Sequence, residues 1–412
     1  MNTVQDSTRF RDHLARRWAE WQDAGLERRP SVFGSGQGAV AEIDGEERLL
    51  FASSNYLGLS DHPALRQAAR VALDRFGAGA GGSRLTTGTG AVHRELEQEV
   101  ADWLDFPDCV WLPTGYQTNL AVLSVLADSR EEQVTVFSDE KNHASIIDGI
   151  RFAKSSGTRL SVYPHRDVGH LAELLRTRET SHAVVVTDGL FSMDGTVAPV
   201  RELREVCDRY GALLVVDDAH GIGTLGEGVS GRGCCSAAGV RPDVLVGTAS
   251  KALGTEGGFL CCDRILADLI RNQARSYVFS TAASPVTAAA TLASVRLVRD
   301  GEAGVGELHS NARYLRKSLE QRGILVGGVT EGPIVPVAVG DEHLALAVQE
   351  ALREAAIHVP AIRWPTVRKG HAILRITVTA EHTLPQVDRL VDVLSRSLMD
   401  LAVRPAYGSV HL

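Results

Sequence analysis

The sequence has no excess of basic residues. It contains 43 Lys and Arg against 51 Asp and Glu, which gives a formal net charge of −8 at pH 7. The sequence also lacks a basic stripe, the usual electrostatic feature of a protein that binds nucleic-acid phosphates. We therefore expect no nucleic acid among the partners of the protein.

Long hydrophobic runs are missing as well. No apolar segment approaches the roughly 18 residues that a membrane-spanning helix requires. The first residues, MNTVQDSTRFRDHL, are too polar for a secretory signal. The sequence therefore predicts no membrane span and a cytoplasmic location.

Cysteine is sparse and lacks metal-binding spacing. The six cysteines include two adjacent pairs, Cys234–Cys235 and Cys261–Cys262, and none of the six stands in a CxxC motif. Zinc and redox sites commonly use that spacing. We expect small buried side chains at these positions and no metal site.

The sequence does contain enough apolar residues for a large core. Its 412 residues are 44% hydrophobic and 23% charged, close to the average for globular proteins. A chain of this length exceeds the size of a single core. We predict an N-terminal helix and arm over residues 1–59, a large cofactor-binding domain over 60–285 and a small C-terminal domain over 286–412.

From about residue 60, strand-like apolar runs alternate with helical ones. The strand-like runs are CVWL, VTVF, LSVY, AVVVTD and LLVVDD. Apolar strands separated by helices indicate an α/β domain, with a mainly parallel sheet covered by helices on both faces. In such a sheet the functional residues gather at the C-terminal ends of the strands.

The two ends of the chain predict smaller units. After Pro285 comes a long helical segment, followed by two strand–helix units that begin at IVPVAV and ILRITV and predict an α+β domain. Near the N-terminus, Phe10, Leu14, Trp18 and Trp21 recur at helical spacing. This apolar face either packs on the helix's own domain or binds a partner.

One glycine-rich segment matches a dinucleotide-binding motif. Residues 77–82, GAGAGG, fit GxGxxG, but that motif must follow a strand and begin a helix. Here the segment follows the helical run ALRQAARVALDRFG and leads into a loop. The sequence therefore argues against a nicotinamide site.

Ionisable side chains follow two successive strands. One strand ends at Asp217, with His220 shortly after it, and the next strand, DVLVGT, leads to Lys251. A buried carboxylate needs a compensating partner. Asp217 therefore faces a protonated ring nitrogen of a cofactor, caps a helix or pairs with an arginine.

Lys251 stands among small polar residues at the same predicted edge of the sheet. A single lysine at a strand end is usually a surface residue, but a partly desolvated lysine has a lowered pKa and forms imines with aldehydes. A lysine for an imine and an aspartate for a ring nitrogen are what pyridoxal 5'-phosphate (PLP) requires.

A phosphate group needs a site of its own. In WLPTGYQTNL a strand ends at Thr114–Gly115–Tyr116 and a helix begins, where free backbone N–H groups favour an anion. His143 follows the next strand and can stack on a cofactor ring. Taken alone, a histidine there is more often a capping or surface residue.

Ten segments, in order along nearly the whole chain, resemble the α-oxoamine synthases, which are PLP-dependent enzymes of fold type I. The segments are FASSNYLGLSDHP, GAGGSRLTTGTGAVHRELE, TGYQTNL, NHASIIDGIR, TDGLFSMDGTVAPV, VVDDAHGIGTLGEGVSGRG, GTASKALGTEGGF, FSTAASP, AIRWPTV and LRITVTAEHT. The resemblance implies a large PLP-binding domain, a smaller C-terminal domain and an N-terminal helical arm.

The same resemblance implies four catalytic residues. Lys251 would form the imine with PLP, Asp217 would pair with the pyridine nitrogen, and His143 would stack on the ring. His220 would contact the phenolic oxygen together with Ser192, and would also lie near the carbonyl of the reacting group.

Other residues would bind the phosphate and the amino acid. The resemblance assigns the phosphate to Thr248 and to the backbone amides of Gly115 and Tyr116. It assigns the carboxylate of the amino acid to Asn55 and Arg375. An arginine suits that task because its guanidinium binds a carboxylate with two parallel hydrogen bonds.

The resemblance also implies a homodimer with shared active sites. Ser280 and Thr281, in FSTAASP, would reach the phosphate of the neighbouring subunit. The distal carboxylate of a pimeloyl donor would meet Arg28 rather than Arg29, although a solvated helix end is an alternative for both.

The predicted reaction joins an amino acid to an acyl thioester, with loss of the thiol and of carbon dioxide, and gives an α-amino ketone. The GGSRL and AIRWPTV segments favour the biotin-pathway members, which would use L-alanine and pimeloyl-CoA or a pimeloyl carrier protein. The alternatives are glycine or serine with another acyl-CoA, transamination, or a non-catalytic PLP-binding protein. Trp364 and Ser284 stand where the family often has proline.

Overall fold

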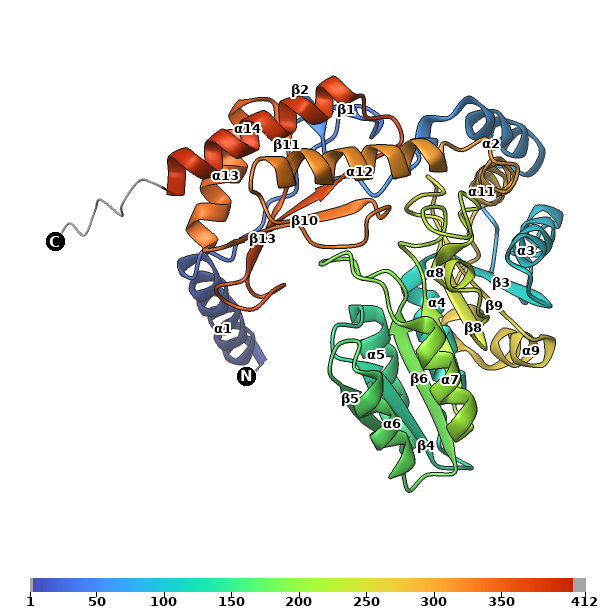
Figure 1. Ribbon diagram of the computed structural model, residues 1–412. Helices are drawn as coiled ribbons and strands as arrows, with labels where there is room; N and C mark the ends of the chain where they lie inside the picture. Colours follow the sequence, from blue (N-terminus) through green and yellow to red (C-terminus); the bar gives the residue numbers. More distant parts are fainter. Residues whose placement is uncertain (1–2, 403–412) are drawn as a thin grey trace.

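The computed structural model of the chain describes residues 3–402 (Figure 1). Residues 1, 2 and 403–412 of the predicted outer domains lie outside the described part. The boundaries predicted at residues 59/60 and 285/286 stay predictions. In the described part, no helix is long and apolar enough to cross a membrane.

A seven-stranded sheet forms the centre of the larger unit. Its order is β3-β9-β8-β7-β6-β4-β5, and β9 alone runs antiparallel to its neighbours. The strands are β3 (Asp108–Leu112), β4 (Val134–Asp139), β5 (Arg159–Tyr163), β6 (His182–Asp188), β7 (Leu213–Asp217), β8 (Val244–Thr248) and β9 (Gly258–Cys262). The prediction of a mainly parallel sheet is confirmed.

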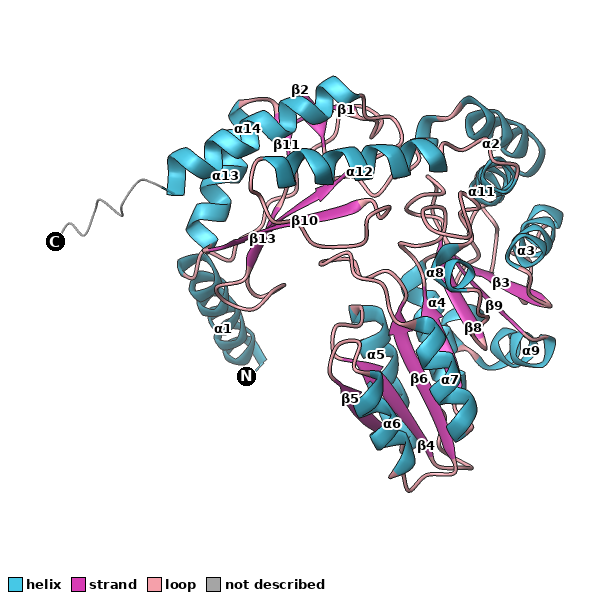
Figure 2. Cartoon of the chain, in the orientation of Figure 1, coloured by secondary structure: helices cyan, strands magenta, loops and turns pink. Residues whose placement is uncertain are grey.

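The sheet is buried on both faces because its central strands are apolar at successive positions. In β6, Ala183 and Val185 join one core cluster, and Val184 and Val186 join another on the opposite face. Helices cover the sheet on its two sides (Figure 2). They are α3 (Ala91–Leu104), α4 (Gly115–Leu126), α5 (Ala144–Ala153), α6 (Val168–Arg176), α7 (Val200–Tyr210), α8 (Gly233–Ala238), α9 (Arg264–Gln273) and α10 (Arg275–Val278).

Two smaller three-stranded sheets lie in the upper part of Figure 1. The order β10-β13-β12 contains β10 (Ile334–Gly340), β12 (Ala361–Ile362) and β13 (Ala372–Thr377). The order β1-β2-β11 contains β1 (Val40–Ile43), β2 (Glu46–Leu50) and β11 (Ile357–His358). The second sheet therefore joins the N-terminal arm to the C-terminal region.

The remaining helices complete the two ends. They are α2 (Pro63–Phe76), α11 (Pro285–Arg299), α12 (Val305–Gln321), α13 (Glu342–Glu354) and α14 (Leu384–Ala402), with short 3-10 turns at Leu59–Asp61 and Lys154–Ser156. Ser284 caps α11, because its hydroxyl accepts a hydrogen bond from the Thr287 amide at 3.1 Å. Serine is among the preferred residues at a helix N-cap.

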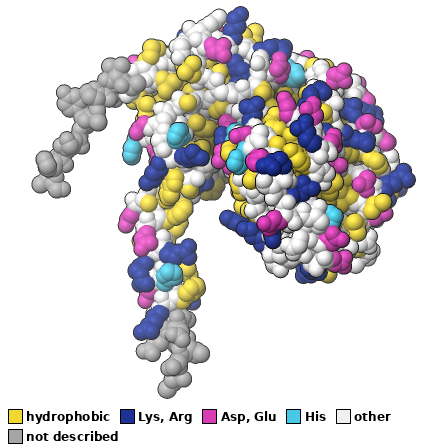
Figure 3. All heavy atoms as spheres, turned by 60° about the horizontal axis from the view of Figure 1, so that its bottom comes forward, with side chains coloured by type: hydrophobic (Ala, Val, Ile, Leu, Met, Phe, Trp, Pro, Cys, Tyr) yellow, Lys and Arg dark blue, Asp and Glu magenta, His cyan; other side chains and the backbone are white. Residues whose placement is uncertain are grey.

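The first helix, α1 (Thr3–Asp23), extends away from the rest of the molecule (Figure 3). Its apolar stripe is open to solvent, with exposed fractions of 62% for Phe10, 44% for Leu14, 51% for Trp18 and 42% for Trp21. The stripe therefore does not pack on the helix's own domain, which was one of the two predicted arrangements.

A buried ion pair connects the loop after α2 to the sheet. Arg84 Nη2 lies 2.8 Å from Glu97 Oε1, and both side chains are almost fully buried. Arg84 Nη1 also donates to the Trp111 carbonyl at 2.9 Å, and the Trp111 amide donates to Glu97 at 3.0 Å. One polar network thus holds together the loop after α2, helix α3 and strand β3.

We expect Arg84→Ala to destabilise the protein by about 3–5 kcal/mol, because it removes the buried cation beside Glu97 and leaves only the mostly exposed Arg94, 3.3 Å from the carboxylate. The matched control is Arg159→Ala, which removes one partner of the exposed pair with Glu179 and should cost less than about 1 kcal/mol. Urea denaturation of both variants measures the difference. Equal effects would contradict the structural role of the network.

Candidate functional site

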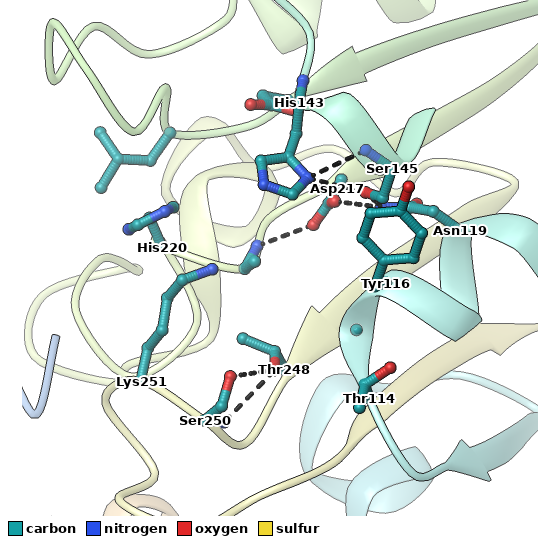
Figure 4. Close-up of a pocket in the computed structure, with 14 residues that line it drawn as sticks. Thr114, Tyr116, Asn119, His143, Ser145, Asp217, His220, Thr248, Ser250 and Lys251 are labelled. Carbon is teal, nitrogen blue, oxygen red and sulfur yellow. Dashed lines mark hydrogen bonds between the residues drawn. The ribbon is translucent and has the colours of Figure 1, made fainter. Parts of the chain in front are cut away.

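A cavity of about 250 Å³ opens at the C-terminal ends of β6, β7 and β8 (Figure 4). The first turns of α4 and α5 also line it. Parallel strands bring these ends to one edge, as the sequence predicted. Seven predicted site residues line the cavity: Gly115, Tyr116, His143, Asp217, His220, Thr248 and Lys251.

Asp217 is buried at the end of β7 and is held by two hydrogen bonds. Its Oδ2 accepts from Asn119 Nδ2 at 2.6 Å and its Oδ1 accepts from the Ala219 amide at 3.1 Å. No arginine forms an ion pair with it in residues 3–402, and it caps no helix there. Two of the three predicted arrangements, the helix cap and the arginine pair, are therefore not observed in the described residues, and the pairing with a ring nitrogen stays a prediction.

Lys251 lies in the loop that follows β8, and its side chain extends into the cavity beside His220 (Figure 4). Burial lowers the pKa of its amine, and the charge of Asp217 partly opposes this shift. A lysine in such surroundings gives up its proton more readily than one in water. The side chain can therefore act as a nucleophile or a base.

The two histidines of the cavity are held in fixed orientations. His220 is buried and its Nδ1 is hydrogen-bonded to the hydroxyl of Tyr56 at 2.7 Å. His143 stands at the N-terminus of α5, with Nδ1 2.8 Å from the Ser145 hydroxyl. Burial lowers the pKa of both rings, and Lys251 lowers that of His220 further. Both imidazoles are therefore neutral at neutral pH.

The start of α4 forms the other end of the cavity. The Thr114 hydroxyl accepts a hydrogen bond from the Gln117 amide at 3.1 Å. The amides of Gly115 and Tyr116 have no helical partner, because these two residues begin α4. A Cβ on Gly115 would lie 3.3 Å from Thr248, so glycine permits the close approach of α4 to β8. Free amides at a helix N-terminus favour a phosphate.

Arg375 and Ser192 lie together outside the lining of this cavity. Arg375 Nε donates to the Ser192 carbonyl at 2.6 Å, and Arg375 is close enough to His220 to lower its pKa. Asn55 Nδ2 donates to the Gln37 carbonyl at 3.0 Å and to the Ser60 hydroxyl at 2.9 Å.

Two further predicted residues, Ser280 and Thr281, contact other parts of the chain. Ser280 accepts from Gln117 Nε2 at 3.0 Å, and Thr281 pairs with Ser83 in an isolated bridge. Neither lines the cavity.

Arg28 is exposed, and its Nη2 donates to the Thr366 hydroxyl at 3.1 Å. Thr366 and Ser192 both line a second cavity of about 960 Å³. Arg28 therefore stands at the edge of this larger space.

Sequence reasoning missed several residues that complete the site. Asn119 is one helical turn after Gly115, and Ser145 is two residues after His143. Their spacing from predicted site residues could therefore have identified both. Asp188 ends β6 as Asp217 ends β7 and could have been found by the same rule. The contact of Tyr56 with His220 spans 164 positions and carries no local pattern.

The cavity combines an amine, a carboxylate and an anion site. Lys251, Asp217 and the start of α4 all line this one cavity, and the lysine amine enters it beside His220 (Figure 4). These are the groups that a phosphorylated aldehyde with a basic ring nitrogen requires. The residues present therefore fit the type of cofactor that the sequence predicts.

Comparisons with known proteins agree with this description. The family model described as aminotransferase class I and II matches residues 46–394. The chain is 38% identical to 8-amino-7-oxononanoate synthase 2 of Bacillus subtilis, over 92% of this chain and 95% of the relative. A solved structure of SPT with its PLP internal aldimine has a TM-score of 0.88 and 30% identity, and covers 95% of this chain and 98% of that one.

A longer relative is the biotin biosynthesis bifunctional protein BioWF of Cutibacterium acnes, which is 47% identical over 98% of this chain. The chain spans only 61% of the length of that relative. These matches confirm the resemblance to the α-oxoamine synthases, and with the family model they establish that the chain belongs to the aminotransferase class I and II family.

Proposed function

We propose that the chain is a PLP-dependent α-oxoamine synthase that joins L-alanine to a pimeloyl thioester and gives 8-amino-7-oxononanoate for biotin synthesis. The observation that carries this proposal is the cavity in which Lys251 and Asp217 face the free amides of α4. The names of the relatives, 8-amino-7-oxononanoate synthase 2 and biotin biosynthesis bifunctional protein, support the choice of reaction.

Thr248 and the amides of Gly115 and Tyr116 would hold the phosphate of PLP, and Asp217 would hold its ring nitrogen. When bound, PLP supplies an aldehyde and a ring that accepts the electron pair left by a departing proton. In this role the Asp217 carboxylate would accept hydrogen bonds from Asn119 and the Ala219 amide as well as from the ring nitrogen. The ring nitrogen beside it would therefore keep its proton.

Lys251 would act twice. Its amine would bind the aldehyde in the resting enzyme and, once the amino acid has displaced it, would take the α-proton at Nζ. Both roles need an unprotonated amine, and burial favours that form by lowering the pKa. The ring of His143, which lines the cavity, would cover one side of the cofactor and would direct proton transfer to the other side.

Arg375 would bind the carboxylate of the amino acid, with Asn55 beside it. The bond from Arg375 Nε to the Ser192 carbonyl fixes the guanidinium and leaves its terminal nitrogens for the substrate. His220 is neutral and its Nδ1 is engaged by Tyr56, so its Nε2 can meet an oxygen of the reacting group. Ser192 would assist at the phenolic oxygen.

The acyl donor would occupy the larger cavity, with its distal carboxylate at Arg28 and Thr366. We also propose a cytoplasmic homodimer, in which Ser280 and Thr281 reach the phosphate site of the partner subunit. The exposed position of Thr281 and its absence from the lining of its own cavity support that arrangement.

The main alternative is another member of the same family, with serine or glycine and a different acyl-CoA. The similarity to SPT, at 30% identity over nearly the whole chain, supports this alternative. Transamination and non-catalytic PLP binding are weaker alternatives, because neither requires the large second cavity.

We expect Lys251→Ala to lower thiol release by more than about a thousandfold, since it removes both nucleophile and base. Asp217→Asn should cause a loss of about a hundredfold or more, because a neutral amide no longer favours a protonated ring nitrogen. A spectrophotometric thiol assay measures both effects.

The control for these variants is Lys154→Ala, which removes an exposed lysine at the end of α5. Circular dichroism establishes that each variant is folded. Near-normal turnover of a folded Lys251→Ala or Asp217→Asn protein would refute the role of that residue.

The choice of substrates can be tested with the same assay. With pimeloyl-CoA, we expect thiol release with alanine to exceed that with glycine or serine by more than about tenfold, a difference of about 1.4 kcal/mol. Release with serine or glycine alone would instead favour the alternative synthase.

The role of Arg28 can be tested separately. Arg28→Ala should raise the KM for pimeloyl-CoA by roughly tenfold to a hundredfold, because a charged hydrogen bond is lost. The KM for octanoyl-CoA, which lacks the distal carboxylate, should not change. Arg29→Ala is the matched control, since Arg29 is exposed and pairs with Glu27. An equal effect of Arg28→Ala on both donors would exclude a contact with the distal carboxylate.

A further inference from the structure

A second carboxyl group, Asp188, lies in the same cavity, and the mechanism above does not use it. Asp188 ends β6 and is the register partner of Asp217 at the end of β7. Both side chains are buried and both line the cavity with Lys251. Two carboxyl groups therefore share one lysine.

The two carboxyl groups have unequal hydrogen bonds. Asp217 accepts short bonds from Asn119 and the Ala219 amide. In the described part of the chain, the side chain of Asp188 accepts a single hydrogen bond, from the His143 amide at the longer distance of 3.3 Å. A carboxylate is stabilised by the number and strength of its donors, so Asp217 is the better site for the negative charge.

The charges around Asp188 act in the same direction. Asp217 on β7 and Asp139 on β4 repel a negative charge there, Lys251 attracts it, and the His143 amide donates to it; Tyr163 on β5 also faces it. Burial and Asp217 outweigh the others and raise the pKa of Asp188 well above its ordinary value. When two such groups are close, one keeps its proton.

We propose that Asp188 is a protonated positioning residue, which fixes the start of α5 through the His143 amide and leaves Asp217 as the single carboxylate facing Lys251. The backbone around it supports this geometry. The Asp188 amide donates to Asn142 Oδ1 at 2.8 Å, and Asn142 Nδ2 donates to the Val186 carbonyl at 2.8 Å. The end of strand β6 and the loop that carries His143 are thus joined next to Asp188.

A neutral Asp188 has a consequence for Lys251. A second carboxylate in the cavity would favour the ammonium form of the lysine, because opposite charges at short distance stabilise each other. A protonated carboxyl group adds no such charge, so the amine stays available. This consequence rests on the proposed function, whereas the protonation of Asp188 and its contact with His143 do not.

Infrared spectroscopy of the full chain tests the proposal directly. At pH 7.5 the wild type should show the carbonyl stretch of a protonated carboxylic acid, and Asp188→Asn should lose it. Burial also raises the pKa of Asp218, to about 6, so Asp218 is mainly ionised at this pH. Asp194→Asn is the matched control, because Asp194 pairs with Lys141 at 2.7 Å and its removal should leave the band intact.

Activity provides a second test through rescue. Asp188→Ala should lower turnover by about tenfold or more, because the His143 amide loses its acceptor. Asp188→Asn should recover most of that loss, since an amide oxygen accepts the same hydrogen bond without a charge. If Asp188→Asn does not fold, Asp188→Glu serves instead and should shift the band.

A band that is absent from the wild type, or that no substitution of Asp188 removes or shifts, would overturn the proposal. So would an Asp188→Asn protein as impaired as Asp188→Ala. If the band behaves as expected but no variant, including the wild type, releases thiol, the protonation of Asp188 stands and the proposed function fails.

Discussion

The structure depends on keeping one buried negative charge beside one buried amine. Removing a carboxylate from water costs several kcal/mol unless donors replace the water. Asn119 and the Ala219 amide supply those donors to Asp217, and the lowered pKa of Lys251 shows that burial prevails over attraction at the amine. A buried lysine with a lowered pKa and a hydrogen-bonded carboxyl group thus line one cavity.

The fold supplies this environment through its parallel strands. The C-terminal ends of β6, β7 and β8 meet at one edge, and the N-termini of α4 and α5 face the same space. Negative side chains from the strands and positive helix ends therefore line the same cavity. A cofactor with an anionic group at one end and a cationic ring nitrogen at the other complements that arrangement.

The sequence predicted those parts of the site that follow from local patterns. Asp217 ends one apolar strand, Lys251 follows the end of the next, and Gly115 begins a helix after another strand, so their meeting follows from sheet geometry. Contacts between distant loops, such as Tyr56 with His220, depend on tertiary packing and leave no periodic trace. The sequence also left the placement of α1 undecided, because an apolar helix face looks the same whether it packs on its own domain or is left for a partner.

Reduction with borohydride tests the central claim most directly. The protein is incubated with PLP, reduced and digested, and the peptides are analysed by mass spectrometry. The account predicts a pyridoxyl phosphate group on the peptide that contains Lys251. At a low concentration of PLP, the same peptide from the Asp217→Asn variant should carry less of this group than the wild-type peptide. Labelling confined to exposed lysines such as Lys154, with Lys251 unmodified, would contradict it.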